Sequence, residues 1–260
     1  MGEAQFFSTR AVRAVAARFG IPVVLLFATA HVIRCQQPPS ASDLLRQFES
    51  ETVFWRQIDA AKAIVAAKEK DVLPKLESWL THEDRHLRGN AAFVYAGLED
   101  PRGFDVITAI LRDYSERPAG VGSGGNRWSL REQIREDRYY AAHLLGDLKD
   151  PRAIPILVPL LADPDVNYIV PWSLGQIGDR AAIQPLIGEL SDQNPSMRVL
   201  AIYALAELKA VEALPKLRQL LSDNERCNFD KLESVAQAAE AAITKLQPKH
   251  FERRCSGLFD

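Results

Sequence analysis

Leu145 to Leu157 has the sequence LGDLKDPRAIPIL, and Leu174 to Leu186 has the sequence LGQIGDRAAIQPL. A shift of 29 residues superposes the two stretches and places Gly146 on Gly175. Each stretch contains the end of one helical pattern, a turn with an aspartate, and the start of a second helical pattern. A unit of this length cannot bury its apolar face alone, so successive units must stack into a solenoid.

Further copies of the unit lie on both sides of this pair. A shift of 31 residues superposes Asp192 on Asp223, and a shift of 50 residues superposes residues 100–102 on residues 150–152. The longer shift indicates an insertion, which we place at residues 115–137. Because strand-like alternation is missing between the copies, the sequence predicts an all-α solenoid of stacked antiparallel helix pairs.

The predicted repeat domain covers residues 49–248 and contains about five helix pairs and a final capping helix. Its pattern, L-G-x-[LI]-x-D-x-R-A-I-x-P-L, resembles the HEAT-like repeats of the phycobilisome lyase type over roughly residues 52–248. This resemblance implies the α-solenoid fold and raises bilin lyase activity as a function. The fold alone decides little about activity, because function depends on a site built onto the solenoid.

The N-terminus has the layout of a secretory signal peptide. Basic residues precede a short apolar run at residues 20–28, which ends in the small residues Ala28-Thr29-Ala30. We therefore predict a signal peptide at residues 1–30 and export to the periplasm or beyond the cell. A polar linker at residues 31–48 and a tail at residues 249–260 complete the predicted organisation. An uncleaved signal anchor, or a lipid on Cys35, is the alternative, and membrane contact is expected only through this segment.

Charge and cysteine content narrow the partners. The chain carries 32 basic and 34 acidic side chains, a net charge of −2, so nucleic acid is not an expected partner. In an oxidising compartment, Cys227 and Cys255 are candidates for a disulfide, which would leave Cys35 unpaired. No cofactor is predicted.

Residues 82–86, HEDRH, match the H-E-x-x-H pattern of zinc peptidases. That chemistry needs both histidines on one face of a continuous helix, together with a third ligand. The repeat alignment instead places His82 in the turn between two helices, with Asp84 as the N-cap of the second. We therefore predict no metal site, and His82 and His86 remain the only candidate ligands.

Charged residues recur at fixed positions of the repeat. We interpret them as a structural ladder that ties the repeats together, because charges in such arrays are usually solvated or paired. The recurring residues are Arg88, Arg138 and Arg198 at one position and Asp100, Asp150 and Asp179 at another.

Aromatic side chains recur at a position of the first helices that the core does not need. With Val166, Val170, Leu174 and Ile177 on the core face, Trp172 points away from the core at 100° per residue. Exposed aromatic surface usually marks an interaction site. The predicted partner-binding residues form the aromatic stripe: Phe93, Tyr139, Tyr140, His143, Tyr168, Trp172 and Tyr203.

The aromatic stripe also has two interpretations that need no partner. The chain covers it with its own insertion near Trp128 or with the tail, or the bulky residues only tighten the packing between neighbouring helices. We predict an exported, non-catalytic scaffold that binds a protein partner through the stripe. We favour it over lyase activity because an exported chain would not meet newly made phycobiliproteins. The alternative function is an enzyme or enzyme subunit, either a lyase-like factor or a metal-dependent enzyme that uses HEDRH.

Overall fold

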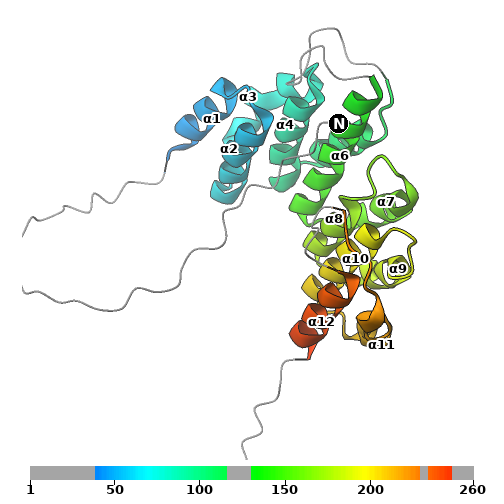
Figure 1. The fold of residues 1–260 in the computed structure, drawn as a ribbon. Coiled ribbons are helices and arrows are strands. Elements are labelled where there is room, and N and C mark those ends of the chain that lie inside the picture. The colour runs from blue at the N-terminus through cyan, green and yellow to red at the C-terminus, as the bar shows by residue number, and fades with distance from the viewer. Residues whose placement is uncertain (1–38, 116–129, 229–233, 248–260) are drawn as a thin grey trace, which may run out of the picture. The chain divides into compact units, whose positions relative to one another are not determined.

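Residues 39–115, 130–228 and 234–247 are described by the computed structural model (Figure 1). In these residues the regular structure is helical and the helices are joined by short loops, apart from one isolated bridge between Arg226 and Ser234. The α-helices are α1 (Ala41–Ser50), α2 (Phe54–Ala67), α3 (Leu73–Leu76), α4 (Arg85–Gly97), α5 (Pro101–Leu111), α6 (Leu130–Leu148), α7 (Ile154–Leu157), α8 (Val170–Ile177), α9 (Ile183–Glu189), α10 (Pro195–Glu207), α11 (Leu214–Gln219) and α12 (Val235–Leu246).

The helices form consecutive antiparallel pairs, as the repeat predicts. The first helices α2, α4, α6, α8, α10 and α12 pack against one another in order, and α5, α7, α9 and α11 lie beside them (Figure 1). Short 3₁₀ turns flank the second helices: η1 (Lys70–Val72), η2 (Glu77–Thr81), η4 (Pro151–Ala153), η5 (Val158–Ala162), η6 (Arg180–Ala182), η7 (Val211–Ala213) and η8 (Leu220–Ser222). The all-α solenoid is confirmed.

Helix boundaries differ from the predicted ones in two places. Helix α1 begins at Ala41, inside the segment predicted to be a linker, because Ser40 and Asp43 form a capping box there. Helix α6 runs without interruption from Leu130 to Leu148, so residues 130–137 of the predicted insertion are the first part of a repeat helix.

The aspartate of the repeated turn caps the second helix of the pair. Asp100 accepts a hydrogen bond from the backbone N–H of Arg102, and Asp150 accepts the equivalent bond from Arg152. The residue before each aspartate has a positive φ, 70° at Glu99 and 56° at Lys149, which turns the chain out of the first helix. These aspartates therefore stabilise turns and are not the acids of the predicted ladder.

The arginine ladder exists, but it uses other acids. Arg138 contacts Asp163 at 2.7 Å, and Arg198 contacts Asp223 at 2.9 Å. Each acid follows the second helix of the same pair, so the arginine joins the first helix to the turn that leads into the next repeat. The capping aspartates do not pair with these arginines, because their carboxylates already bind backbone N–H groups and a local arginine.

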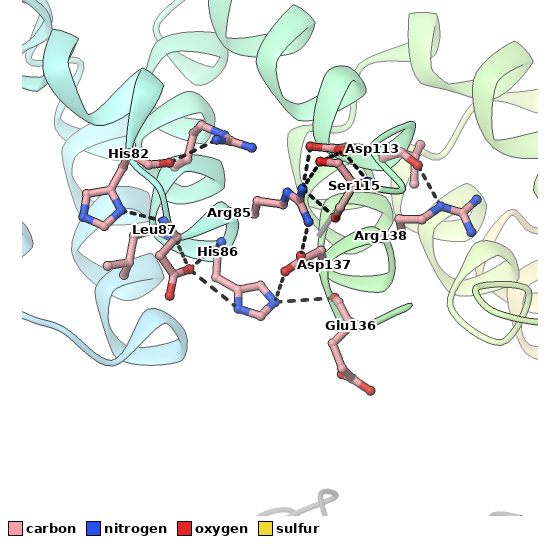
Figure 2. Close-up of polar contacts among 12 residues, drawn as sticks. His82, Arg85, His86, Leu87, Asp113, Ser115, Glu136, Asp137 and Arg138 are labelled. Carbon is pink, nitrogen blue, oxygen red and sulfur yellow. Dashed lines mark hydrogen bonds and ion pairs between the residues drawn. The ribbon is translucent and has the colours of Figure 1, made fainter. Parts of the chain in front are cut away.

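Arg85 ties together the two ends of the predicted insertion (Figure 2). Its guanidinium group contacts Asp113 at 2.8 Å, donates to the Ser115 carbonyl at 2.9 Å and contacts Asp137 at 3.0 Å. Asp137 is completely buried, so its charge depends on partners within the protein. In this repeat, Arg85 takes the place that Arg138 and Arg198 hold in later repeats, while Arg88 donates to the His82 carbonyl.

The glycine of the opening motif lets neighbouring first helices approach closely. A Cβ atom on Gly146 would lie 2.7 Å from Ser173 Cα in α8, and one on Gly175 would lie 3.3 Å from Ala204 Cα in α10. The Ser173 hydroxyl also donates to the Ala142 carbonyl of α6 at 2.9 Å. The small residue that recurs in the motif therefore sets the distance between successive first helices.

Gly146→Ala should lower the free energy of unfolding by about 1–3 kcal/mol, because the added methyl group meets backbone. Gly188→Ala is the matched control, since a Cβ there meets nothing within 4 Å and the residue lies in helix α9. It should leave stability unchanged or raise it by up to about 1 kcal/mol. Urea unfolding followed by circular dichroism measures both, and equal effects would contradict the close approach.

Arg85→Met should lower the free energy of unfolding by about 3–5 kcal/mol, because it leaves the buried Asp137 carboxylate without its guanidinium partner. Arg131→Met removes an arginine whose side chain is 80% exposed and pairs with Asp165, so it should cost less than about 1 kcal/mol. Thermal and urea unfolding of both variants test this prediction. If Arg85→Met lost no more stability than Arg131→Met, the stabilising contact between Arg85 and Asp137 would be refuted.

Candidate functional site

The HEDRH segment starts a helix and does not run through one (Figure 2). Asp84 caps α4 by accepting from the backbone N–H groups of His86 and Leu87, which confirms the predicted N-cap. His82 lies before the helix, where its Nδ1 accepts from the Asp84 N–H at 3.0 Å and its ring stacks on Trp79. His86 is buried elsewhere, against Phe54.

The two histidines therefore do not present nitrogens to a shared ligand position. His86 Nε2 faces Asp137 Oδ1 and the Glu136 carbonyl, each at 3.5 Å (Figure 2). Across the described parts of the chain, His, Cys, Asp and Glu form no group of three or more with the geometry of a metal site. The segment thus supplies a helix cap and a buried ring.

Five rings from four successive first helices form a continuous row. Trp172 stacks on His143 with ring centres 4.4 Å apart, and His143 lies parallel to Tyr140 at 6.2 Å. Tyr140 meets His86 edge to face at 5.1 Å, and His86 stacks on Phe54 at 4.1 Å. We call Phe54, His86, Tyr140, His143 and Trp172 the aromatic row.

Hydrogen bonds fix the centre of the aromatic row. The Tyr140 hydroxyl donates to Asn90 Oδ1 at 2.5 Å, and Asn90 Nδ2 donates to Gln57 Oε1 at 3.0 Å. Gln57 in turn donates to the Phe48 carbonyl at 3.1 Å. Burial, together with the charge of Asp147, raises the pKa of the Tyr140 hydroxyl above its usual range, so it remains a donor at neutral pH.

A charged pair borders the row beside His143. Lys62 Nζ of α2 lies 2.7 Å from Asp147 Oδ2, and the same oxygen lies 3.6 Å from His143 Nδ1. Burial lowers the pKa of His143, while the Asp147 carboxylate opposes this shift and Lys62 adds to it. The imidazole is therefore mainly neutral at neutral pH.

The residues of the predicted stripe differ in exposure: four are half-buried, two are exposed and one, Phe93, is buried. Tyr139, Tyr140, His143 and Trp172 are half-buried, and the last three belong to the aromatic row. Tyr168 and Tyr203 are 38% and 39% exposed, and the Tyr168 hydroxyl accepts from Asn194 Nδ2 at 2.8 Å.

The prediction that Phe93 binds a partner was wrong, because this residue is only 5% exposed and cannot anchor a partner. The residues aligned with it in later repeats are more exposed: His143 and Trp172 are half-buried, and Tyr203 is 39% exposed.

The repeat alignment did not identify four residues of the site, which are Phe54, His86, Asp147 and Lys62. Phe54 precedes the first clear copy of the repeat, and His86 is hidden in the apparent zinc motif. Asp147 follows His143 by four residues on one helix, a spacing that predicts contact and that could have identified the pair. The contact of Lys62 with Asp147 could not be predicted from the sequence, because the two residues are 85 positions apart in the chain.

Several predicted features involve residues outside the described ranges. Residues 1–30, Cys35 and Cys255 lie there, so the disulfide to Cys227 stays a prediction, and Cys227 itself is buried. Within the described ranges, each helix is too short or too polar to cross a lipid bilayer.

Comparison with known proteins identifies the repeat type. The family model for HEAT repeats matches residues 129–188 and 162–227. Bilin biosynthesis protein PecE of Mastigocladus laminosus is 32% identical over 177 residues, covering 67% of this chain and 60% of that protein. PecE of Nostoc sp. is 29% identical over 70% of this chain and 71% of its own length.

A shorter match links the chain to a lyase subunit. Phycocyanobilin lyase subunit alpha of Synechococcus elongatus is 38% identical over 96 residues, covering 33% of this chain and 35% of that protein. The chain thus spans between about a third and 71% of the length of these relatives. A relative named as a subunit supports interaction with a protein partner.

These relatives overturn two predictions from the sequence. The non-catalytic scaffold is contradicted, because the relatives are named for bilin biosynthesis and for lyase activity, which was the alternative function. The predicted export is contradicted by the same relatives, which are named as bilin biosynthesis proteins and lyase subunits. The repeat pattern, the helix pairs and these relatives agree, and the chain is a HEAT-repeat protein of the phycobilisome-lyase HEAT-like type.

Proposed function

We propose that this chain is a lyase-like factor that takes part in attaching a bilin to an acceptor protein, and that the aromatic row holds the bilin. The observation that carries the proposal is the continuous contact of rings from α2, α4, α6 and α8 beside a charged pair. The similarity to PecE and to a phycocyanobilin lyase subunit supplies the chemical class of the ligand.

The row suits a flat conjugated molecule. Trp172, His143 and Tyr140 stack with interplanar angles of 12° and 8°, so their faces are occupied by one another. A ligand across the row therefore meets ring edges, whose partial positive charge favours the face of a conjugated system. A bilin is an open-chain tetrapyrrole of this kind.

The border of the row suits the acidic side chains of a bilin. The Lys62 side chain is 44% exposed, and its ammonium group has three donors, of which the contact with Asp147 needs one. The remaining donors are free to bind a carboxylate. Lys62 and the row thus offer one apolar surface and one positive charge side by side.

Attachment also requires contact with the acceptor protein. Tyr168 and Tyr203 are the exposed aromatic residues of the predicted stripe. Tyr168 lies just before α8, which carries the last ring of the row, and Tyr203 lies on α10 of the next repeat. We assign them to the protein partner, since exposed tyrosines are favoured anchors in interfaces. Phe93 is excluded by its burial.

The purified chain should bind phycocyanobilin, and Trp172→Ala should weaken binding roughly 10- to 100-fold, because it removes about 1.5–3 kcal/mol of buried aromatic contact. Tyr114→Ala is the control, since Tyr114 is 60% exposed, packs on Arg138 and is not one of the rings of the row. Titration followed by bilin absorbance measures the dissociation constants, and circular dichroism verifies the fold of each variant.

Two results would count against this function. Wild-type protein that does not change the phycocyanobilin spectrum would refute bilin binding. Equal losses in Trp172→Ala and Tyr114→Ala would place the bilin elsewhere on the chain.

A further inference from the structure

His143 has the arrangement of a proton-transfer residue. Its Nδ1 is buried and faces Asp147 Oδ2 at 3.6 Å, whereas the side chain as a whole is 32% exposed. The accessible part of the ring therefore lies on the side away from Nδ1, which includes Nε2. A histidine with one nitrogen against a carboxylate and the other open is oriented to accept or donate a proton at the open nitrogen.

Neighbouring residues hold this orientation. Trp172 stacks on the imidazole from α8, and Tyr140 lies parallel to it on the other side. Asp147 follows His143 by one helical turn and is held in place by Lys62 of α2. The two parallel rings thus restrain the faces of the imidazole, and Asp147 restrains the edge that carries Nδ1.

We propose that His143 transfers the proton during bilin attachment, with Asp147 and Lys62 as positioning residues beside its Nδ1. This inference rests on the proposed function. It adds a role in the reaction to a residue that otherwise contributes only a ring to the row.

The addition of a nucleophile to a bilin double bond needs one group that accepts a proton and then returns it. A nucleophilic side chain of the acceptor protein, X–H, gives its proton to His143 Nε2 as X bonds to a carbon of a bilin double bond. The π electron pair of that bond moves into the conjugated chain, which then takes the proton from His143. The product contains X–C and C–H bonds in place of X–H and C=C, and His143 ends neutral again.

The charges around His143 fit this sequence of events. Burial keeps the pKa of His143 below its usual value, so the free imidazole is neutral and ready to accept a proton. Asp147 on α6 raises the pKa, and Lys62 on α2 lowers it. From α8 the neighbour is the uncharged Trp172, and Tyr140 stays protonated because burial and nearby Asp147 and Asp59 raise its pKa.

His86, the second histidine of the row, is not a competitor for this role. It is only 6% exposed, and its ring is enclosed by Phe54 and Tyr140. A ligand on the surface of the row does not reach it.

The test uses the full chain, saturating phycocyanobilin and a small thiol, 2-mercaptoethanol, as the nucleophile. Thiol addition shortens the conjugated system, so loss of the long-wavelength absorbance gives the rate. Wild-type protein should accelerate the addition at least about 100-fold over free phycocyanobilin, the lower range for acid–base catalysis. The rate should rise with pH through a pKa below the usual histidine value and then level off, because neutral His143 is the active form.

Three variants separate proton transfer from binding, because all rates are compared at saturation. His143→Phe keeps a flat ring and should lose about 100-fold in rate together with the pH step. Asp147→Asn should move the step to lower pH, since it removes the charge that raises the pKa. Lys62→Met should move the step to higher pH, since it removes the charge that lowers the pKa.

Each outcome decides between the two proposals. A chain that binds phycocyanobilin but does not accelerate thiol addition would overturn the role of His143 and leave bilin binding intact. A full rate in His143→Phe, or a pH step that does not move in opposite directions in the Asp147 and Lys62 variants, would also overturn it. A chain that does not bind phycocyanobilin at all would overturn both proposals.

Discussion

The separation of neighbouring first helices is the constraint on which the rest of the structure depends. Gly146 meets Ser173, and Gly175 meets Ala204, at distances that a larger residue would not allow. Rings on adjacent helices contact one another only because their backbones lie so close, and the stack of His143 on Trp172 spans the same helix pair that Gly146 brings together. One small residue per repeat thus sets both the packing of the solenoid and the spacing of its aromatic surface.

Much of the fold was predictable because it depends on local signals repeated along the chain. The motif glycine, the capping aspartate and the helical periodicity each act within one or two turns, so their effect is visible in the sequence. Asp84 could be recognised as a cap for the same reason. The acids that pair with Arg138 and Arg198 could not be identified from the sequence, because two sets of aspartates recur at fixed spacing and the sequence does not show which set is already bound to backbone N–H groups.

The candidate site was only partly predictable, because it is assembled from several repeats that differ in burial. Tyr140, His143 and Trp172 followed from the repeat alignment, but the same alignment placed the buried Phe93 on the surface. Lys62 and Phe54 come from a helix whose repeat signal is faint. The error about function had another origin: the predicted export signal was given more weight than the repeat type, and the relatives reversed that order.

The tie made by Arg85 has a consequence for the evolution of the chain. Because Asp113, Ser115 and Asp137 are fixed to one guanidinium group, the two repeats keep their register whatever sequence joins them. Doubling the length of the connecting segment would then cost only about 0.6 kcal/mol in loop-closure entropy. The solenoid therefore has a point at which new sequence can be acquired, lost or exchanged as a module, while selection on the remaining repeats continues undisturbed.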